Sequence, residues 1–158
     1  MHFLVALAAI ALSTGAAAEL PVAPCDKAIL GHGSADWRSE AVFAGPVGVR
    51  RHPLGAMSPM RNGFVTKMPL LVEGRAPETV VVSVPPGLQR RVFLYYGQSS
   101  SFANDRGDAA IEFELCDNKP RTIWPGGIRI KGDKPVHLLV SAEGLPPIRL
   151  PLGRPTAY

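Results

Sequence analysis

Hydrophobic and polar residues alternate with a period of two in several short stretches of the chain. Val80, Val82 and Val84 fall on one side of such a stretch, and Thr79 and Ser83 fall on the other. This period is typical of a β-strand with one buried face. Runs of this kind, separated by Gly and Pro, predict strands over residues 41–44, 65–72, 78–84, 91–96, 110–115, 127–131, 136–142 and 148–152. Residues 143–147 (EGLPP) predict a turn that joins the last two strands as a hairpin.

No stretch shows helical periodicity over more than two turns. About seven or eight short strands therefore predict an all-β chain, built as a single antiparallel β-sandwich of immunoglobulin-like or jelly-roll-like form. A small closed β-barrel is the alternative architecture. A true immunoglobulin domain is disfavoured, because Glu114 stands where that fold places a Tyr before its second Cys.

Residues 1–18 have the layout of a secretory signal peptide. An apolar run over residues 3–12 is followed by small residues that end at Ala18. The run is too short to span a bilayer, so we expect no stable membrane span once the signal is cleaved. We therefore expect cleavage after Ala18, a single domain over residues 19–158, and a secreted or extracytoplasmic protein.

Charge is mild and scattered. The 17 Lys and Arg residues against 13 Asp and Glu residues give a formal net charge of +4. The paired basic residues, Arg50 with Arg51 and Arg90 with Arg91, lack interleaved aromatics, so we expect no nucleic-acid partner. If this net charge has a functional role, we expect weak attraction to anionic polymers of the cell envelope.

The chain has two cysteines, Cys25 and Cys116. In an oxidising compartment two such thiols are expected to form a disulfide. Cys116 is out of step with the core-facing residues Ile111, Phe113 and Leu115. We therefore expect the bridge at the rim of the fold, where it would tie down the N-terminal segment. Two free buried thiols are the alternative.

No residues are assigned to catalysis, cofactor binding or metal binding. His32, Ser34 and Asp36 lie close together in sequence, but they lack the spacing of a nucleophile elbow. A copper site could draw on His52 and on three methionines, but no His follows Cys116 as a blue-copper centre requires; the methionines are Met57, Met60 and Met68.

Two further groups are candidates for chemistry or binding. Glu112 and Glu114 share one strand face, an arrangement compatible with glycoside hydrolysis and equally with a solvated strand. Tyr95, Tyr96 and Trp124 form a candidate aromatic binding surface for carbohydrate or protein. Trp124 begins a Trp-Pro-Gly-Gly turn and could instead cover the end of the sandwich.

The run from Phe113 through Cys116 to the Trp124 turn (F-x-x-C followed by W-x-G-G) resembles a signature of small exported β-rich proteins of high-GC Gram-positive bacteria, of unknown function. The resemblance implies export and a closing β-hairpin, and no activity. Those proteins often carry another Cys after the Gly-Gly turn, where this chain has residues 133–137 (DKPVH). The difference leaves Cys25 as the only partner for Cys116.

Together these features predict an exported, non-catalytic accessory or binding module of the cell envelope without a cofactor. Envelope polysaccharide or another exported protein is the expected partner. An extracytoplasmic hydrolase with an unrecognised site is one alternative, and a structural, partner-stabilising subunit that uses a sheet edge is another.

Overall fold

The fold is all-β. A computed structural model describes residues 19–29, 37–55, 57–61, 63–74, 78–97, 107–117 and 120–156. Helical structure in these residues is limited to the four-residue α1 (Trp37–Glu40), to two 3-10 turns, η1 (Cys25–Lys27) and η2 (Pro86–Leu88), and to the 3-10 conformation of Gly97. The expected absence of long amphipathic helices therefore holds for this part of the chain.

The largest sheet has five strands in the order β1-β9-β7-β12-β13. Its strands are β1 (Val22–Ala23), β7 (Thr79–Ser83), β9 (Ala110–Glu114), β12 (Val136–Ala142) and β13 (Ile148–Gly153). β1 is parallel to β9, and all other neighbours are antiparallel. The predicted hairpin of the last two strands is confirmed as β12 and β13.

Two four-stranded sheets complete the fold. One has the order β10-β6-β3-β2 and contains β2 (Ala41–Ala44), β3 (Val47–Arg50), β6 (Leu70–Glu73) and β10 (Arg121–Trp124). The other has the order β4-β5-β11-β8 and contains β4 (Ser58–Met60), β5 (Gly63–Lys67), β8 (Val92–Tyr96) and β11 (Gly126–Ile130). The sequence pattern did not predict β1, β3, β4 or β10.

Opposed prolines separate these two sheets. Trp124 lies opposite Leu70 and Gly127 lies opposite Lys67, so the unbroken register places Pro125 opposite Pro69. Because proline has no N–H to donate, the hydrogen-bond ladder between residues 63–73 and residues 121–130 is interrupted there. The expected single β-sandwich of two sheets is therefore wrong, because the hydrogen bonds form three sheets. For the same reason the one strand predicted over residues 65–72 is two strands, β5 and β6.

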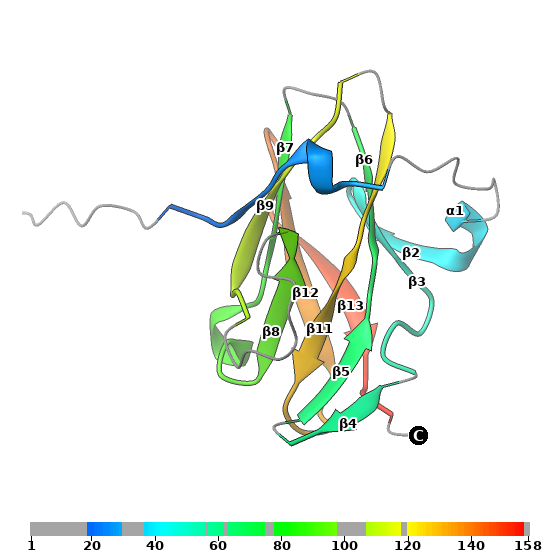
Figure 1. The fold of residues 1–158 in the computed structure, drawn as a ribbon, viewed down its shortest axis with the longest axis vertical. Coiled ribbons are helices and arrows are strands. Elements are labelled where there is room, and N and C mark those ends of the chain that lie inside the picture. The colour runs from blue at the N-terminus through cyan, green and yellow to red at the C-terminus, as the bar shows by residue number, and fades with distance from the viewer. Residues whose placement is uncertain are drawn as a thin grey trace, which may run out of the picture.

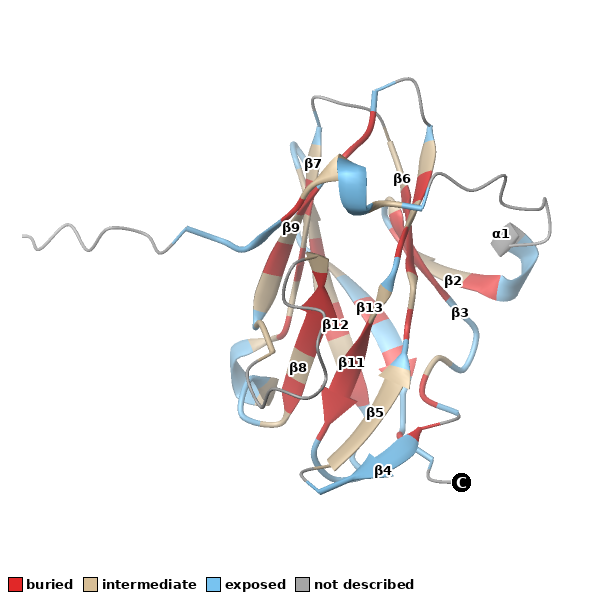
Figure 2. Cartoon of the chain, in the orientation of Figure 1, coloured by how far each residue is buried: buried red, intermediate tan, exposed pale blue. Residues whose placement is uncertain are grey.

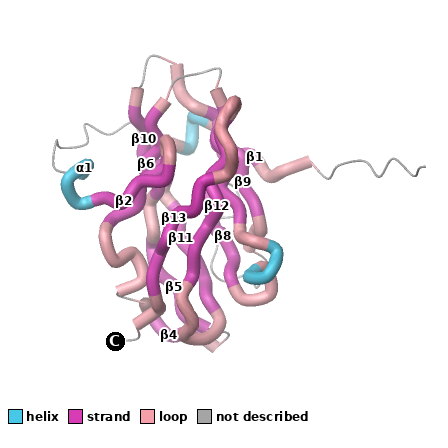
Figure 3. The backbone as a smooth tube through the Cα atoms, turned by 180° about the vertical axis from the view of Figure 1, so that it is seen from behind, coloured by secondary structure: helices cyan, strands magenta, loops and turns pink. Residues whose placement is uncertain are grey.

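All three sheets contribute to one hydrophobic core. β8, β11 and β5 form one layer, and β12 and β13 form another, which lies behind the first in Figure 1 and in front of it in Figure 3. Figure 2 shows the alternation of buried and more exposed positions along these strands. Val80, Val82 and Val84 are buried, whereas Thr79 and Ser83 are only partly covered, as their alternation predicts.

Both ends of the described chain form backbone hydrogen bonds with segments that are distant in sequence. At the N-terminal end, β1 pairs with β9, and Ile29 then exchanges backbone hydrogen bonds with Ile123 of β10. At the C-terminal end, Thr156 forms backbone hydrogen bonds with Leu54 and Met57.

The predicted disulfide between Cys25 and Cys116 is present. Cys25 lies in η1, and Cys116 lies just beyond the end of β9, so the bridge holds the N-terminal segment as expected. Cys116 itself is buried.

Candidate functional site

The predicted aromatic surface is not exposed. Tyr95, Tyr96 and Trp124 have exposed fractions of 0%, 2% and 1%. Tyr96 and Trp124 each make an edge-to-face contact with Phe113, with ring centroids 5.6 and 5.3 Å apart. These two rings belong to the core, and the interpretation of the three residues as an exposed binding surface is wrong.

Tyr95 lies on the opposite face of β8 from Tyr96. The guanidinium of Arg129, which is also buried, donates a hydrogen bond to the Tyr95 hydroxyl and lies 5.3 Å from the centre of its ring. Gly107 passes over the same ring: a Cβ built on it would lie 2.8 Å from the Tyr95 Cζ atom. This cation and ring are therefore part of the packing between β8, β11 and the chain that precedes β9.

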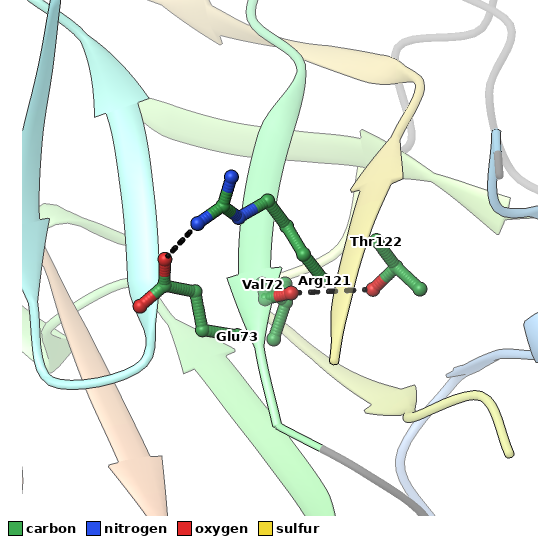
Figure 4. A network of polar contacts seen from close by, with 4 residues as sticks. All are labelled: Val72, Glu73, Arg121 and Thr122. Carbon is green, nitrogen blue, oxygen red and sulfur yellow. Dashed lines mark hydrogen bonds and ion pairs between the residues drawn. The ribbon is translucent and has the colours of Figure 1, made fainter. Parts of the chain in front are cut away.

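A polar network joins β6 to β10. Figure 4 shows the ion pair between Arg121 and Glu73, with 3.1 Å between Nη2 and Oε1. Figure 4 also shows the Thr122 hydroxyl, which donates to the carbonyl oxygen of Val72 at 3.4 Å. The same hydroxyl accepts a hydrogen bond from the Trp124 indole N–H at 3.2 Å. Each contact links neighbouring strands or neighbouring positions of one strand, so the network stabilises the pairing of β6 and β10.

The carboxylates of the predicted hydrolase site lie on β9. Glu112 is opposite Val81 and Glu114 is opposite Thr79, on the side of the sheet away from Ile111 and Phe113. Glu114 is exposed and Glu112 is partly exposed, which is the arrangement of a solvated strand face.

Residues considered for nucleophilic or metal chemistry are dispersed or undescribed. His32, Ser34 and Asp36 lie outside the described residues. Met57 and Met68 are buried in the core, whereas Met60 of β4 is exposed. Among the described residues, no three His, Cys, Asp or Glu side chains gather in a way that could hold a metal ion.

A cleft of about 430 Å³ is the strongest candidate for a functional site. Three segments that are distant in sequence meet there: the β2–β3 turn, the beginning of β7 and the turn after β12. They contribute an acidic pair, several apolar side chains and one hydroxyl; the lining residues are Gly45, Pro46, Glu78, Thr79, Val80, Ala142, Glu143 and Leu145.

Local backbone geometry shapes this cleft. Gly45 has a φ of +56°, which a glycine adopts readily, and a Cβ there would lie 3.0 Å from the Cδ1 atom of Ile148. A hydrogen bond of 3.1 Å from the Leu145 N–H to the Ala142 carbonyl closes the opposite turn. The turn leaves the Leu145 side chain 51% exposed at the cleft.

The cleft offers two kinds of contact. The carboxylates of Glu78 and Glu143 are exposed and can attract a cation, while Pro46 and Leu145 offer apolar surface. Alternation along each strand could not identify this site, because its residues converge only once three turns are placed side by side.

No helix among the described residues has the length and apolar character needed to cross a membrane. No protein-family model matches the chain, and no match was found among curated proteins or among solved structures.

Proposed function

We propose that this protein is an exported, non-catalytic binding module of the cell envelope, and that the cleft between Glu78 and Glu143 receives its partner. The observation that carries the proposal is the convergence of two carboxylates and exposed apolar surface on one cavity. A cavity with apolar walls and a few convergent polar groups is the usual form of a ligand site.

The ligand that fits this lining combines a cation with an apolar stem. Lys and Arg side chains have this form, because their methylene groups pack on apolar surface while the charged end stays hydrated. We therefore assign the cleft to a Lys- or Arg-bearing segment of another exported protein. The exposure of both carboxylates implies a moderate affinity, since ion pairs in water are weak.

Export is part of this proposal. The signal-like residues 1–18 and the disulfide both support it, because stable disulfides are typical of oxidising compartments. The resemblance to small exported proteins of high-GC Gram-positive bacteria supports the same location and adds no activity.

The test uses protein purified after export and a blocked tripeptide with Lys between two Leu residues. NMR titration should shift the amide signals of Val80 and Ala142. Replacing both carboxylates, Glu78→Gln with Glu143→Gln, should weaken binding about three- to tenfold, the sum expected of two exposed ion pairs.

A matched variant removes two carboxylates elsewhere, Glu40→Gln with Glu112→Gln, and should keep the original affinity. Equal binding of a tripeptide with Glu in place of Lys, or no shift at the cleft, would contradict the proposal. Turnover of envelope polysaccharide that disappears on Glu112→Gln or Glu114→Gln would instead favour the hydrolase.

A further inference from the structure

Five cationic side chains gather where three turns meet. Arg61 lies in the β4–β5 turn, Arg90 and Arg91 precede β8, and Lys131 and Lys134 lie between β11 and β12. We call these five residues the basic end. The sequence shows only Arg90 and Arg91 as neighbours, and the fold brings the other three to them.

Backbone contacts hold these turns together. The Lys131 N–H donates to the Arg91 carbonyl oxygen at 2.7 Å. The Arg91 guanidinium donates in return to the carbonyl oxygens of Lys131 at 3.2 Å and Lys134 at 2.8 Å. Gly63 brings the β4–β5 turn alongside, because a Cβ there would lie 3.4 Å from the Cα atom of Lys131. Arg91 thus positions the turn, and the Lys131 and Lys134 side chains remain exposed.

Few carboxylates accompany the basic end in the part of the chain that the structure describes. Among the described residues of its three turns, Asp133, beside Lys134, is the one carboxylate. The basic end also lies far from the acidic cleft. β12 runs from Val136, near the basic end, to Ala142, at the cleft, which is roughly 20 Å at the rise of a strand. This distance exceeds the screening length of about 8 Å at physiological salt, so the two charged regions act separately.

We propose that the basic end is a docking surface for a linear polyanion of the cell envelope. Exposed cations on three adjoining turns can contact successive charges of one extended chain, and several weak contacts then act together. Arg and Lys both bind phosphate and carboxylate groups, so the shared chemistry is a row of closely spaced anions. This inference stands independently of the cleft.

The test measures binding of two probes, inorganic polyphosphate and polygalacturonate, by calorimetry on the exported protein. Binding of either probe should weaken at least tenfold between about 50 and about 500 mM NaCl, because salt screens exposed charges. Arg90→Gln with Lys134→Gln should reduce affinity roughly 10- to 30-fold at the lower salt concentration. Arg91 is kept, because its guanidinium holds the turn. The stronger of the two probes identifies the anionic group.

A control variant, Arg50→Gln with Arg149→Gln, removes the same charge from other surfaces and should retain binding. Circular dichroism on both variants establishes that they are folded. The proposal is overturned if neither polymer binds at low salt, or if the two variants lose affinity equally. It is also overturned if anionic lipid vesicles bind while the polymers do not. Peptide binding at the cleft should be unchanged by Arg90→Gln with Lys134→Gln, so the two proposals can fail separately.

Discussion

The hydroxyl of Tyr96 donates a hydrogen bond to the main-chain carbonyl oxygen of Met68, at the point where β5 and β6 are separated. Pro69 and Pro125 interrupt the ladder beside this carbonyl, although Met68 N–H still donates to the Gly126 carbonyl at 2.9 Å. The phenol is fully buried, and burial raises its pKa well above the usual range. Tyr96 therefore supplies, from a third strand, a hydrogen bond within the interrupted region.

Tyr96→Phe should lower the free energy of unfolding by about 1–3 kcal/mol, because the buried Met68 carbonyl loses its side-chain donor. Urea denaturation should show a lower midpoint with an unchanged slope. Phe keeps the edge-to-face contact with Phe113, so the loss measures the hydroxyl alone. An unchanged midpoint would show that the carbonyl is satisfied in another way.

Gly126 allows β11 to approach β8 closely. A Cβ at this position would overlap the Tyr96 ring and the Tyr95 carbonyl oxygen. Gly126→Ala should therefore lower the free energy of unfolding by about 1–3 kcal/mol or more, since a main-chain atom must move. Gly87→Ala is the control, because no atom lies within 4 Å of a Cβ there, and its thermal midpoint should stay equal or rise slightly. Equal losses in the two variants would contradict this explanation.

The disulfide closes a loop with a sequence separation of 91 residues. Replacing both Cys25 and Cys116 by Ser should lower the free energy of unfolding by about 4–5 kcal/mol on the chain-entropy account, or less if the unlinked chain stays compact. Hydrogen exchange should rise first at the amides of Ala23 and Ile29, which join the N-terminal segment to β9 and β10. Protection that falls uniformly over all three sheets would contradict this local role. An intact mass that does not increase on reduction would rule out the bridge itself.

Alternation predicted the strands with one buried face most accurately. The expected bounds of β12 agree with the structure, and Val136, Leu138 and Val140 are buried as expected. It failed for β3, in which Val47, Gly48 and Val49 are all buried: the Phe43 ring lies so close to Gly48 that a Cβ there would be 2.7 Å from its Cε1 atom. A strand covered on both faces shows no period of two.

The candidate site was harder to predict for a related reason. Tyr95 alternates with the core residues Leu94 and Tyr96, a pattern typical of a solvent-facing position, yet Arg129 and Gly107 cover it through contacts between distant segments. Glu78 begins a predicted strand and Glu143 begins a predicted turn, and only the packing of three segments makes them lining residues of one cleft. Tertiary contacts of this kind leave no local periodicity.

His137 of β12 is partly covered, and its pKa is lowered by burial and, to a smaller extent, by the positive charge of Arg149 on β13. In the unfolded chain the imidazole returns to a pKa of about 6.5 and binds its proton more readily than in the fold. As far as His137 is concerned, the free energy of unfolding should therefore be highest above about pH 6.5 and should decline as the pH falls below that value.

Arg149→Gln should raise the His137 pKa and reduce this decline, because the smaller of the two causes is removed while burial remains. NMR titration of the His137 ring proton measures the pKa, and urea midpoints at about pH 5 and about pH 8 measure the linkage. Arg154→Gln removes an equal charge from an exposed position beyond β13 and should leave the His137 pKa unchanged. A His137 pKa at or above about 6.5 in the original protein would contradict the sign of this prediction.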